Sequence, residues 1–168
     1  MGAGKTTIGQ LLAQKTQLEL IDLDQKIVAE TGLAVPELFK RYGEAGFRRL
    51  ETKALQQSLQ QDVILATGGG IVTQAVNRQL LTASTLPVVY LQADPGVLYQ
   101  RVHGDHNRPN AQNVDLAGFT DLAQQRQAFY QEVSDVAITT AQATPLMVVT
   151  RIMAACARRA SKTMIVKY

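Results

Sequence analysis

The sequence Met1-Gly2-Ala3-Gly4-Lys5-Thr6-Thr7 opens the chain, and most of the other predictions depend on it. It matches the second half of the phosphate-binding loop (P-loop) motif G-x-x-x-x-G-K-[ST]. Glycines let several backbone N–H groups point at one anion, Lys5 adds a positive charge for the β- and γ-phosphates, and the Thr6 hydroxyl can ligate Mg²⁺. A helix predicted from Thr7 to Lys15 directs its positive N-terminal end at the same phosphates. The motif predicts a nucleotide site, although Gly-Lys-Thr after a glycine also arises by chance in a flexible tail.

The other half of this motif is not in the sequence. Its first glycine would fall two residues before Met1, and the strand that normally feeds the loop is also missing. We therefore expect the chain to be truncated at its N-terminus.

Length and composition favour one folded domain, over residues 1–158. Of the 168 residues, 46% are hydrophobic and 18% are charged, as in a globular protein. No apolar run approaches the ~18 residues of a membrane span, and no signal peptide precedes the loop. The single cysteine, Cys156, excludes an internal disulfide framework and is expected in the core. We expect a cytoplasmic protein without a membrane partner.

Positive charge is concentrated at the C-terminal end. The formal net charge is +3, but residues 158–168 hold four basic residues and no acid, so the rest of the chain carries −1. No basic stripe interleaved with aromatic residues is present, and we do not expect nucleic-acid binding. Residues 159–168 are interpreted as a basic C-terminal tail.

Helical and strand patterns alternate along the chain. Strands are predicted over 18–23, 62–66, 87–92 and 136–140, and helices over 7–15, 25–31, 36–43, 45–61, 74–82, 95–102, 116–133 and 145–158. This order is typical of an α/β fold, with a parallel sheet, helices on both faces and ligands at the carboxyl ends of the strands. The stretch 103–117, rich in Gly, Asn, Asp and Pro, is interpreted as a lid loop. Loops and short helices after strands can form a small substrate-binding lobe.

Asp22 and Asp24 lie where the strand after the P-loop helix ends. They are two residues apart, so they point the same way if the backbone is extended. Beside a phosphate site, one carboxylate can hold Mg²⁺, usually through water, and the other can accept the proton of an attacking hydroxyl or hydrogen-bond it. The alternative is a helix cap at Asp24 and a solvated acid.

Helical periodicity separates Arg48 from Arg49. At about 100° per residue, Arg48 shares a face with Leu55 and Leu59, whereas Arg49 shares a face with polar residues. Arg48 is therefore predicted to face the protein and Arg49 the solvent. An inward arginine needs an anionic partner, which is either Glu51 or a substrate carboxylate held by the guanidinium fork.

Three consecutive glycines, Gly68, Gly69 and Gly70, follow a buried strand. Because they cost conformational entropy, something requires bare backbone there. The functional interpretation is close approach of a ligand to free N–H groups. The alternative is a tight strand-to-helix turn.

Three arginines lie in or beside the predicted lid. Arg108 could swing over a bound nucleotide and stabilise charge on the transferred phosphoryl group or stack on adenine. Arg126 shares a helix side with apolar residues and can face inward. For each of these, and for Arg101, the alternative is a solvated surface cation. His103 and His106 match a metal site poorly.

Taken together, these motifs resemble the shikimate kinase family. The matching stretches run in the family's order and cover most of residues 1–140. They are Met-Gly-Ala-Gly-Lys-Thr-Thr (1–7), Ile-Asp-Leu-Asp (21–24), Thr-Gly-Leu-Ala-Val-Pro-Glu-Leu-Phe (31–39), Gly-Glu-Ala-Gly-Phe-Arg-Arg-Leu-Glu (43–51), Ala-Thr-Gly-Gly-Gly-Ile-Val (66–72), Asn-Arg-Pro (107–109) and Arg-Gln-Ala-Phe-Tyr (126–130). Gly-Glu-x-x-Phe-Arg-x-x-Glu followed by Gly-Gly-Gly is far more specific than the P-loop.

The resemblance implies a small P-loop kinase that moves the γ-phosphate of ATP to the 3-hydroxyl of shikimate, in aromatic amino-acid biosynthesis. It implies that Thr6 and Asp22 handle Mg²⁺, and that Asp24 holds substrate hydroxyls and acts as base. It also assigns the remaining site residues. ATP would be bound by Gly2, Ala3, Gly4, Lys5, Thr6, Thr7, Arg101 and the lid residue Arg108; Lys5, Asp24 and Arg108 would be catalytic; and Arg48, Arg126 and Gly68, Gly69 and Gly70 would hold the shikimate carboxylate and ring.

Two departures from the family pattern stand out. The lid reads Arg-Pro-Asn where the family usually has Arg-Pro-Leu-Leu, so lid closure is expected to differ. The family's first strand lies centrally in the sheet. We therefore expect the chain as written to be poorly stable or poorly active, and a chain extended upstream through that strand to melt at a higher temperature.

Two rival functions stay open from the sequence. Gluconate kinase and other small-metabolite kinases share the P-loop and the lid, and inward arginines suit any acceptor that carries a carboxylate. Gly-Gly-Gly with Phe-Arg-x-x-Glu favours shikimate. The second rival is a non-catalytic nucleotide-binding relic. We expect a monomer.

Overall fold

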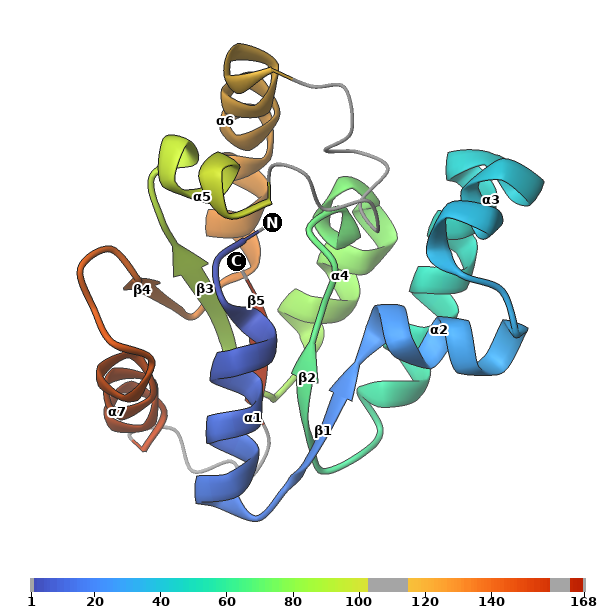
Figure 1. Ribbon diagram of the computed structural model, residues 1–168. Helices are drawn as coiled ribbons and strands as arrows, with labels where there is room; N and C mark the ends of the chain where they lie inside the picture. Colours follow the sequence, from blue (N-terminus) through green and yellow to red (C-terminus); the bar gives the residue numbers. More distant parts are fainter. Residues whose placement is uncertain (1, 103–114, 158–163, 168) are drawn as a thin grey trace.

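A five-stranded parallel sheet forms the centre of the structure (Figure 1). The computed structural model describes residues 2–102, 115–157 and 164–167, and of residues 101, 102 and 164–167 only the backbone. The strand order is β1-β2-β5-β3-β4, and every neighbouring pair is parallel. The bounds are β1 Glu19–Asp22, β2 Val63–Ala66, β3 Val88–Gln92, β4 Val136–Thr139 and β5 Met164–Lys167.

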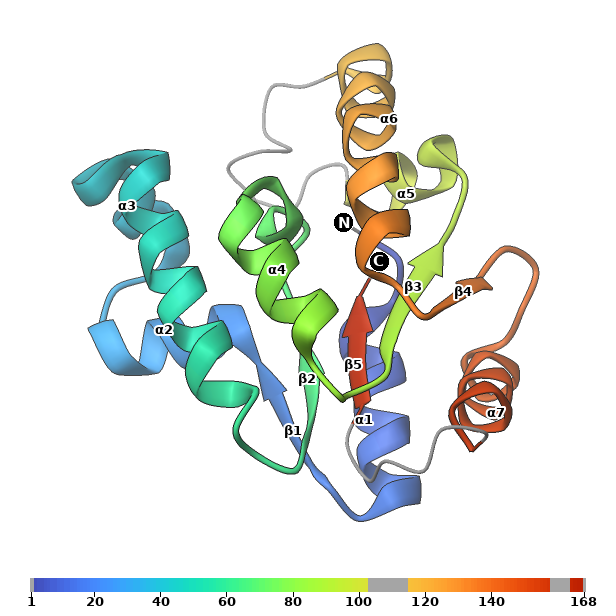
Figure 2. The same ribbon diagram turned by 180° about the vertical axis from the view of Figure 1, so that it is seen from behind.

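Helices cover both faces of this sheet. Figures 1 and 2 show α1 (Lys5–Thr16) and α7 (Pro145–Cys156) on one face, and α4 (Ala75–Ala83) and α6 (Leu116–Val133) on the other. Beside β1, α2 (Leu23–Thr31) packs against α3 (Val35–Ser58). A short 3₁₀ helix, η1 (Ile71–Thr73), leads from β2 toward α4, and α5 (Pro95–Val102) follows β3. The predicted α/β fold with helices on both faces is confirmed.

The burial of β2 explains its sequence. All four of its residues, Val63-Ile64-Leu65-Ala66, are buried, because helices cover it on both sides. A strand in this position reads as a continuous apolar run instead of an alternating pattern. The apolar stripe of α7, which includes the predicted core residue Cys156, closes the α1 face of the sheet.

One glycine bends α3 near its middle. Gly43 has φ 66° and ψ 179°, which is not helical, so α3 consists of two helical segments. A positive φ of this size favours glycine over residues with a β-carbon. The sequence predicted this break, with one helix ending at Gly43 and another beginning at residue 45.

Residues 164–167 belong to the segment that the sequence analysis interpreted as a basic tail, but they form β5. Met164, Ile165 and Val166 pair with residues 64–66 of β2, and Ile165, Val166 and Lys167 pair with residues 88–90 of β3. The central position of the sheet, where a gap was expected, is thus occupied by the C-terminal segment.

The predicted lid lies mostly outside the described residues. Of the range 103–117, the structure describes residues 115–117 only. Asp115 caps α6 by accepting a hydrogen bond from the Gly118 N–H (2.9 Å), so the last two predicted lid residues are helical. Among the helices in the described part of the chain, none has the length and apolarity needed to cross a membrane.

Candidate active site

The P-loop residues form a left-handed turn that leads directly into α1. Gly2 and Gly4 have φ values of 76° and 85°, a region that residues with a β-carbon rarely adopt. Gly4 is the N-cap of α1, and no side chain caps this helix end. The first turn of α1 also carries no acidic residue. A helix N-terminus without a side-chain cap, together with the helix dipole, is suited to bind an anion.

Lys5, Thr6 and Thr7 form the first turn of α1, at the edge where β1 and β2 end (Figure 1). Lys5 is half-buried, and Thr6 and Thr7 are exposed. The structure therefore places the P-loop beside the carboxyl ends of the strands, as predicted for a nucleotide site in an α/β fold.

Asp22 is a helix cap, which corrects the sequence interpretation of the acidic pair. Its Oδ1 accepts hydrogen bonds from the backbone N–H groups of Asp24 (3.0 Å) and Gln25 (3.4 Å), at the start of α2. The strand ends at Asp22, and Asp24 lies in the first helical turn. The argument from extended backbone was therefore wrong, and the cap is Asp22 instead of Asp24.

Gly68 brings two carboxylates close together. A β-carbon built on Gly68 would lie 2.9 Å from Glu51 Oε1 and 3.2 Å from Asp24 Oδ1. A methyl group at this position would therefore push against both acids. The missing side chain at Gly68 therefore lets the carboxylates of Glu51 and Asp24 approach the backbone of the glycine loop closely.

Arg48 is buried, with 4% of its surface exposed, while Arg49 is exposed. The predicted inward orientation of Arg48 is confirmed. Its Nη1 donates to Glu51 Oε2 (2.8 Å), and its Nη2 and Nε donate to Glu44 Oε1 (3.1 and 3.3 Å). The guanidinium also fills the space that a β-carbon on Gly70 would need. Glu51 is thus one partner of Arg48, as the first sequence alternative had it, and the other edge of the guanidinium meets Glu44, whose side chain is 61% exposed.

Glu51, which the sequence analysis treated only as a partner of Arg48, is fully buried beside it. Burial, and to a smaller extent the Asp24 carboxylate, raise its pKa to about 7 against the attraction of Arg48. Burial alone would lower the pKa of Arg48, but Glu51 and Glu44 together raise it above its ordinary value. Glu51 Oε1 has no hydrogen-bond partner in the described part of the structure. Arg48 therefore keeps its charge, while Glu51 can change its protonation near neutral pH.

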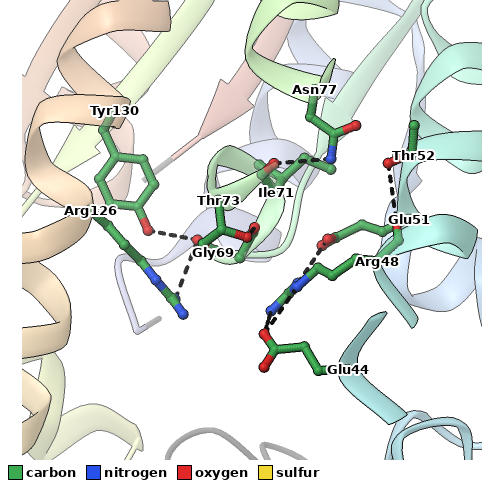
Figure 3. A network of polar contacts seen from close by, with 11 residues as sticks. Glu44, Arg48, Glu51, Thr52, Gly69, Ile71, Thr73, Asn77, Arg126 and Tyr130 are labelled. Atoms are coloured by element: carbon green, nitrogen blue, oxygen red, sulfur yellow. Dashed lines mark hydrogen bonds and ion pairs between the residues drawn. The ribbon is translucent and has the colours of Figure 1, made fainter. Parts of the chain in front are cut away.

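On the other side of the glycine loop, α6 contributes Arg126 and Tyr130. Arg126 Nη1 and the Tyr130 hydroxyl both donate to the Gly69 carbonyl, at 3.4 and 2.8 Å. Burial raises the pKa of Tyr130, so its hydroxyl stays a donor. Figure 3 shows the guanidinium groups of Arg126 and Arg48 pointing to the same side of the loop. Tyr130 was not predicted as a site residue, although it ends the Arg-Gln-Ala-Phe-Tyr motif.

A cavity of about 480 Å³ adjoins this site, between the carboxyl ends of β3 and β4 and helices α5 and α6. Arg126 and Tyr130 line it, together with Tyr90, which stacks on Tyr130 with 5.1 Å between ring centroids. The P-loop, Asp24 and Arg48 do not line it. The cavity is therefore a neighbour of the phosphate region and not part of it.

Two predicted nucleotide contacts lie wholly or partly outside the described residues. Arg108 lies outside the described residues, as do His103 and His106. Arg101 lies in α5 beside the ends of the strands, but only its backbone is described.

The residues present are chemically suited to Mg²⁺. A hydroxyl at Thr6 and a carboxylate at Asp22 are oxygen donors at the same edge of the sheet, and Mg²⁺ prefers such ligands together with waters and phosphates. In the described ranges no three His, Cys, Asp or Glu side chains cluster as a metal site. A magnesium ion held partly by the substrate's phosphates needs no such cluster.

The sequence profile of the shikimate kinase family matches residues 1–157. The shikimate kinase of Bordetella pertussis is 46% identical over 142 residues, which cover 83% of this chain and 67% of that protein. The shikimate kinase of Enterococcus faecalis is 39% identical over 155 residues, which cover 91% of this chain and 92% of that protein.

Solved structures agree with these sequence matches. The shikimate kinase from Acinetobacter baumannii in complex with shikimate has a TM-score of 0.88 and 36% identity, covering 96% of this chain and 91% of that chain. The shikimate kinase from Bacteroides thetaiotaomicron has a TM-score of 0.80 and 30% identity, covering 92% of each chain. The fold, the converging site residues and these relatives agree, and the chain belongs to the shikimate kinase family.

Proposed function

We propose that this protein transfers the γ-phosphoryl group of ATP to the 3-hydroxyl of shikimate, with the residues described above as its active site. One observation carries the proposal. Arg48 and Arg126, from two different helices, flank the Gly68–Gly70 loop, and Asp24 lies against the same loop. The relatives that match this chain in sequence and in fold are shikimate kinases.

The shikimate carboxylate would bind between the two arginines. In the structure the Nε–Nη2 edge of Arg48 is engaged by Glu44, whose side chain is largely exposed. We propose that the substrate carboxylate replaces Glu44 at this edge, because a carboxylate matches the planar fork of a guanidinium. Glu51 would hold Arg48 from the other side, and Tyr130 would hold the loop for Arg126.

Asp24 would orient the acceptor. Its carboxylate would accept a hydrogen bond from the 3-hydroxyl and take that proton as the oxygen bonds to the γ-phosphorus. The bond between the γ-phosphorus and the bridging oxygen breaks in the same displacement, and ADP leaves with the electron pair. With the carboxylate of the substrate fixed by Arg48 and Arg126, only one hydroxyl would reach the γ-phosphate.

The P-loop would hold the nucleotide. Backbone N–H groups of residues 2–7 would bind the phosphates, Lys5 would neutralise the β- and γ-phosphates, and Thr6 with Asp22 would hold Mg²⁺. Bound Mg²⁺ would offset the charge that develops on the transferred group. Arg101 and the lid residue Arg108 would close over ATP. We further propose a monomeric, cytoplasmic enzyme whose kinase domain extends beyond residue 158 to include β5, which pairs with β2 and β3.

ADP release measured in three reactions tests this proposal. The purified chain receives ATP and Mg²⁺ with shikimate, with gluconate, or with no acceptor. Shikimate-dependent ADP release is expected, together with its loss when EDTA removes Mg²⁺. Equal rates with gluconate would contradict the acceptor, and equal rates without an acceptor would contradict the transferase activity.

A further inference from the structure

β5 connects two halves of the sheet. It pairs with β2 through Met164, Ile165 and Val166 on one side, and with β3 through Ile165, Val166 and Lys167 on the other. The order β1-β2-β5-β3-β4 leaves β1–β2 as one half and β3–β4 as the other. Figure 2 shows β5 between them, with α1 behind it.

The position between β2 and β3 has to be filled by a strand. Val63–Ala66 of β2 are all buried, and so are Val88, Val89 and Leu91 of β3. The edges of β2 and β3 that face each other therefore carry backbone N–H and C=O groups away from water. Buried backbone groups without partners are strongly destabilising, so this position demands a parallel strand between them.

The two halves of the sheet carry different parts of the substrate site. β1 leads to Asp22 and Asp24, and β2 leads to Gly68–Gly70. The half formed by β3 and β4 packs against α6, which carries Arg126 and Tyr130. The hydrogen bonds from α6 to the Gly69 carbonyl cross from one half to the other. The spacing between Asp24 and Arg126 consequently depends on the strand between the halves.

β5 also lies against the nucleotide side of the site. α1, whose first turn holds Lys5 and Thr6, packs against β5 as well as against β2. The strand points to the same edge of the sheet as its neighbours, so its carboxyl end reaches the level of the P-loop (Figure 1).

We propose that the C-terminal strand β5 is a working part of the active site. It sets the distance between the half that carries Asp24 and the half that carries Arg126. It also packs against α1, the helix that follows the P-loop. A sequence segment with no apparent role beyond its charge thereby becomes a positioning element for both substrates. The proposal builds on the phosphoryl transfer proposed above, but its main test does not require turnover.

Amide hydrogen exchange of the full chain tests the placement of β5 directly. Residues 165–167 are expected to exchange at least ~100-fold more slowly than an unstructured peptide of the same sequence, because their amides lie inside the sheet. Binding of ADP with Mg²⁺ is expected to slow this exchange further. Exchange at the rate of the free peptide would overturn the placement, and protection that ADP leaves unchanged would overturn the role in the active site.

A proline substitution tests the consequence for function. Ile165→Pro removes one N–H from the ladder in the middle of the sheet, whereas Ile165→Val keeps the N–H and a β-branched side chain. Ile165→Pro is expected to lower the melting temperature by about 6 °C or more and kcat/KM for shikimate at least ~10-fold. Ile165→Val should stay within about twofold of the parent chain.

Identical melting temperatures and kinetics for the two Ile165 variants would overturn the proposal. If Ile165→Pro does not fold at all while Ile165→Val does, β5 is required for the fold, which agrees with the proposal. Protected β5 amides in a protein without shikimate-dependent ADP release would contradict the proposed function only.

Discussion

The guanidinium group of Arg48 lies against the backbone of Gly70, in the space that any β-carbon at position 70 would occupy. Arg48 comes from α3 and Gly70 follows β2, so this contact ties the helical lobe to the edge of the sheet. The same loop meets Asp24 and Glu51 at Gly68. Gly70 thus adjoins a basic side chain and Gly68 adjoins two acidic side chains, so the two positions can be tested by separate substitutions.

Alanine at position 70 should damage the binding of shikimate more than catalysis. The added methyl group would displace the Arg48 guanidinium and so misplace the carboxylate site. We expect Gly70→Ala to raise the KM for shikimate about 10-fold or more with a small change in the KM for ATP. Steady-state kinetics with each substrate varied in turn measure the effect.

Gly68→Ala is the matched comparison for this variant. Its methyl group would press on Asp24 and Glu51 instead of Arg48, so the main loss should be in kcat. If the two variants show the same pattern of kcat and KM, the glycine loop acts only as a tight turn, and the assignment of separate roles is wrong.

Asp22 combines a structural and a metal-binding role in our account, and two substitutions separate them. Asparagine caps helices about as well as aspartate, whereas alanine loses about 1 kcal/mol of cap stability. Asp22→Ala should therefore lower the melting temperature and Asp22→Asn should not. Both should raise the Mg²⁺ concentration needed for half-maximal activity. An unchanged Mg²⁺ requirement in both variants would leave Asp22 as a helix cap alone.

The stability of the fold should depend on the protonation of Glu51. The folded state holds this proton more tightly than the unfolded chain, with a pKa of about 7 against an ordinary value of 4.5. The stabilisation is therefore complete below about pH 4.5 and is lost as the pH rises through about 7. In thermal melts, the parent chain should lose stability relative to Glu51→Gln across this range. A difference between the two proteins that stays constant from pH 4.5 to 7 would refute the assignment.

Local sequence patterns were sufficient for most elements of the fold. The helix α5 runs from Pro95 to Val102, as the proline and the apolar spacing predicted. The helix α6 runs from Leu116 to Val133, also as predicted. The inward side of Arg48 followed from helical periodicity, since seven residues separate it from the buried Leu55. These features depend on neighbours close in sequence, which is why one sequence suffices to predict them.

Features that depend on distant residues were missed or misread. Met164-Ile165-Val166 has the composition of a strand, but the nearby positive charges led to its interpretation as a tail. Its place in the sheet is decided by β2 and β3, which lie far away in the sequence. The pair Asp22 and Asp24 was misread because the strand ends one residue before Leu23, where α2 begins. The role of Tyr130 depends on Gly69, 61 residues earlier.

Comparison of Arg48→Lys with Arg49→Lys tests the central claim most directly. Both substitutions keep the charge and lie side by side on α3, but only Arg48 is buried and contacts Gly70. The measurement is the KM for shikimate at saturating ATP. We expect an increase of about 10-fold or more for Arg48→Lys, because a lysine cannot form the planar fork, and no change for Arg49→Lys. An unchanged KM for shikimate in Arg48→Lys, or equal changes in both variants, would contradict the placement of the substrate carboxylate at this site.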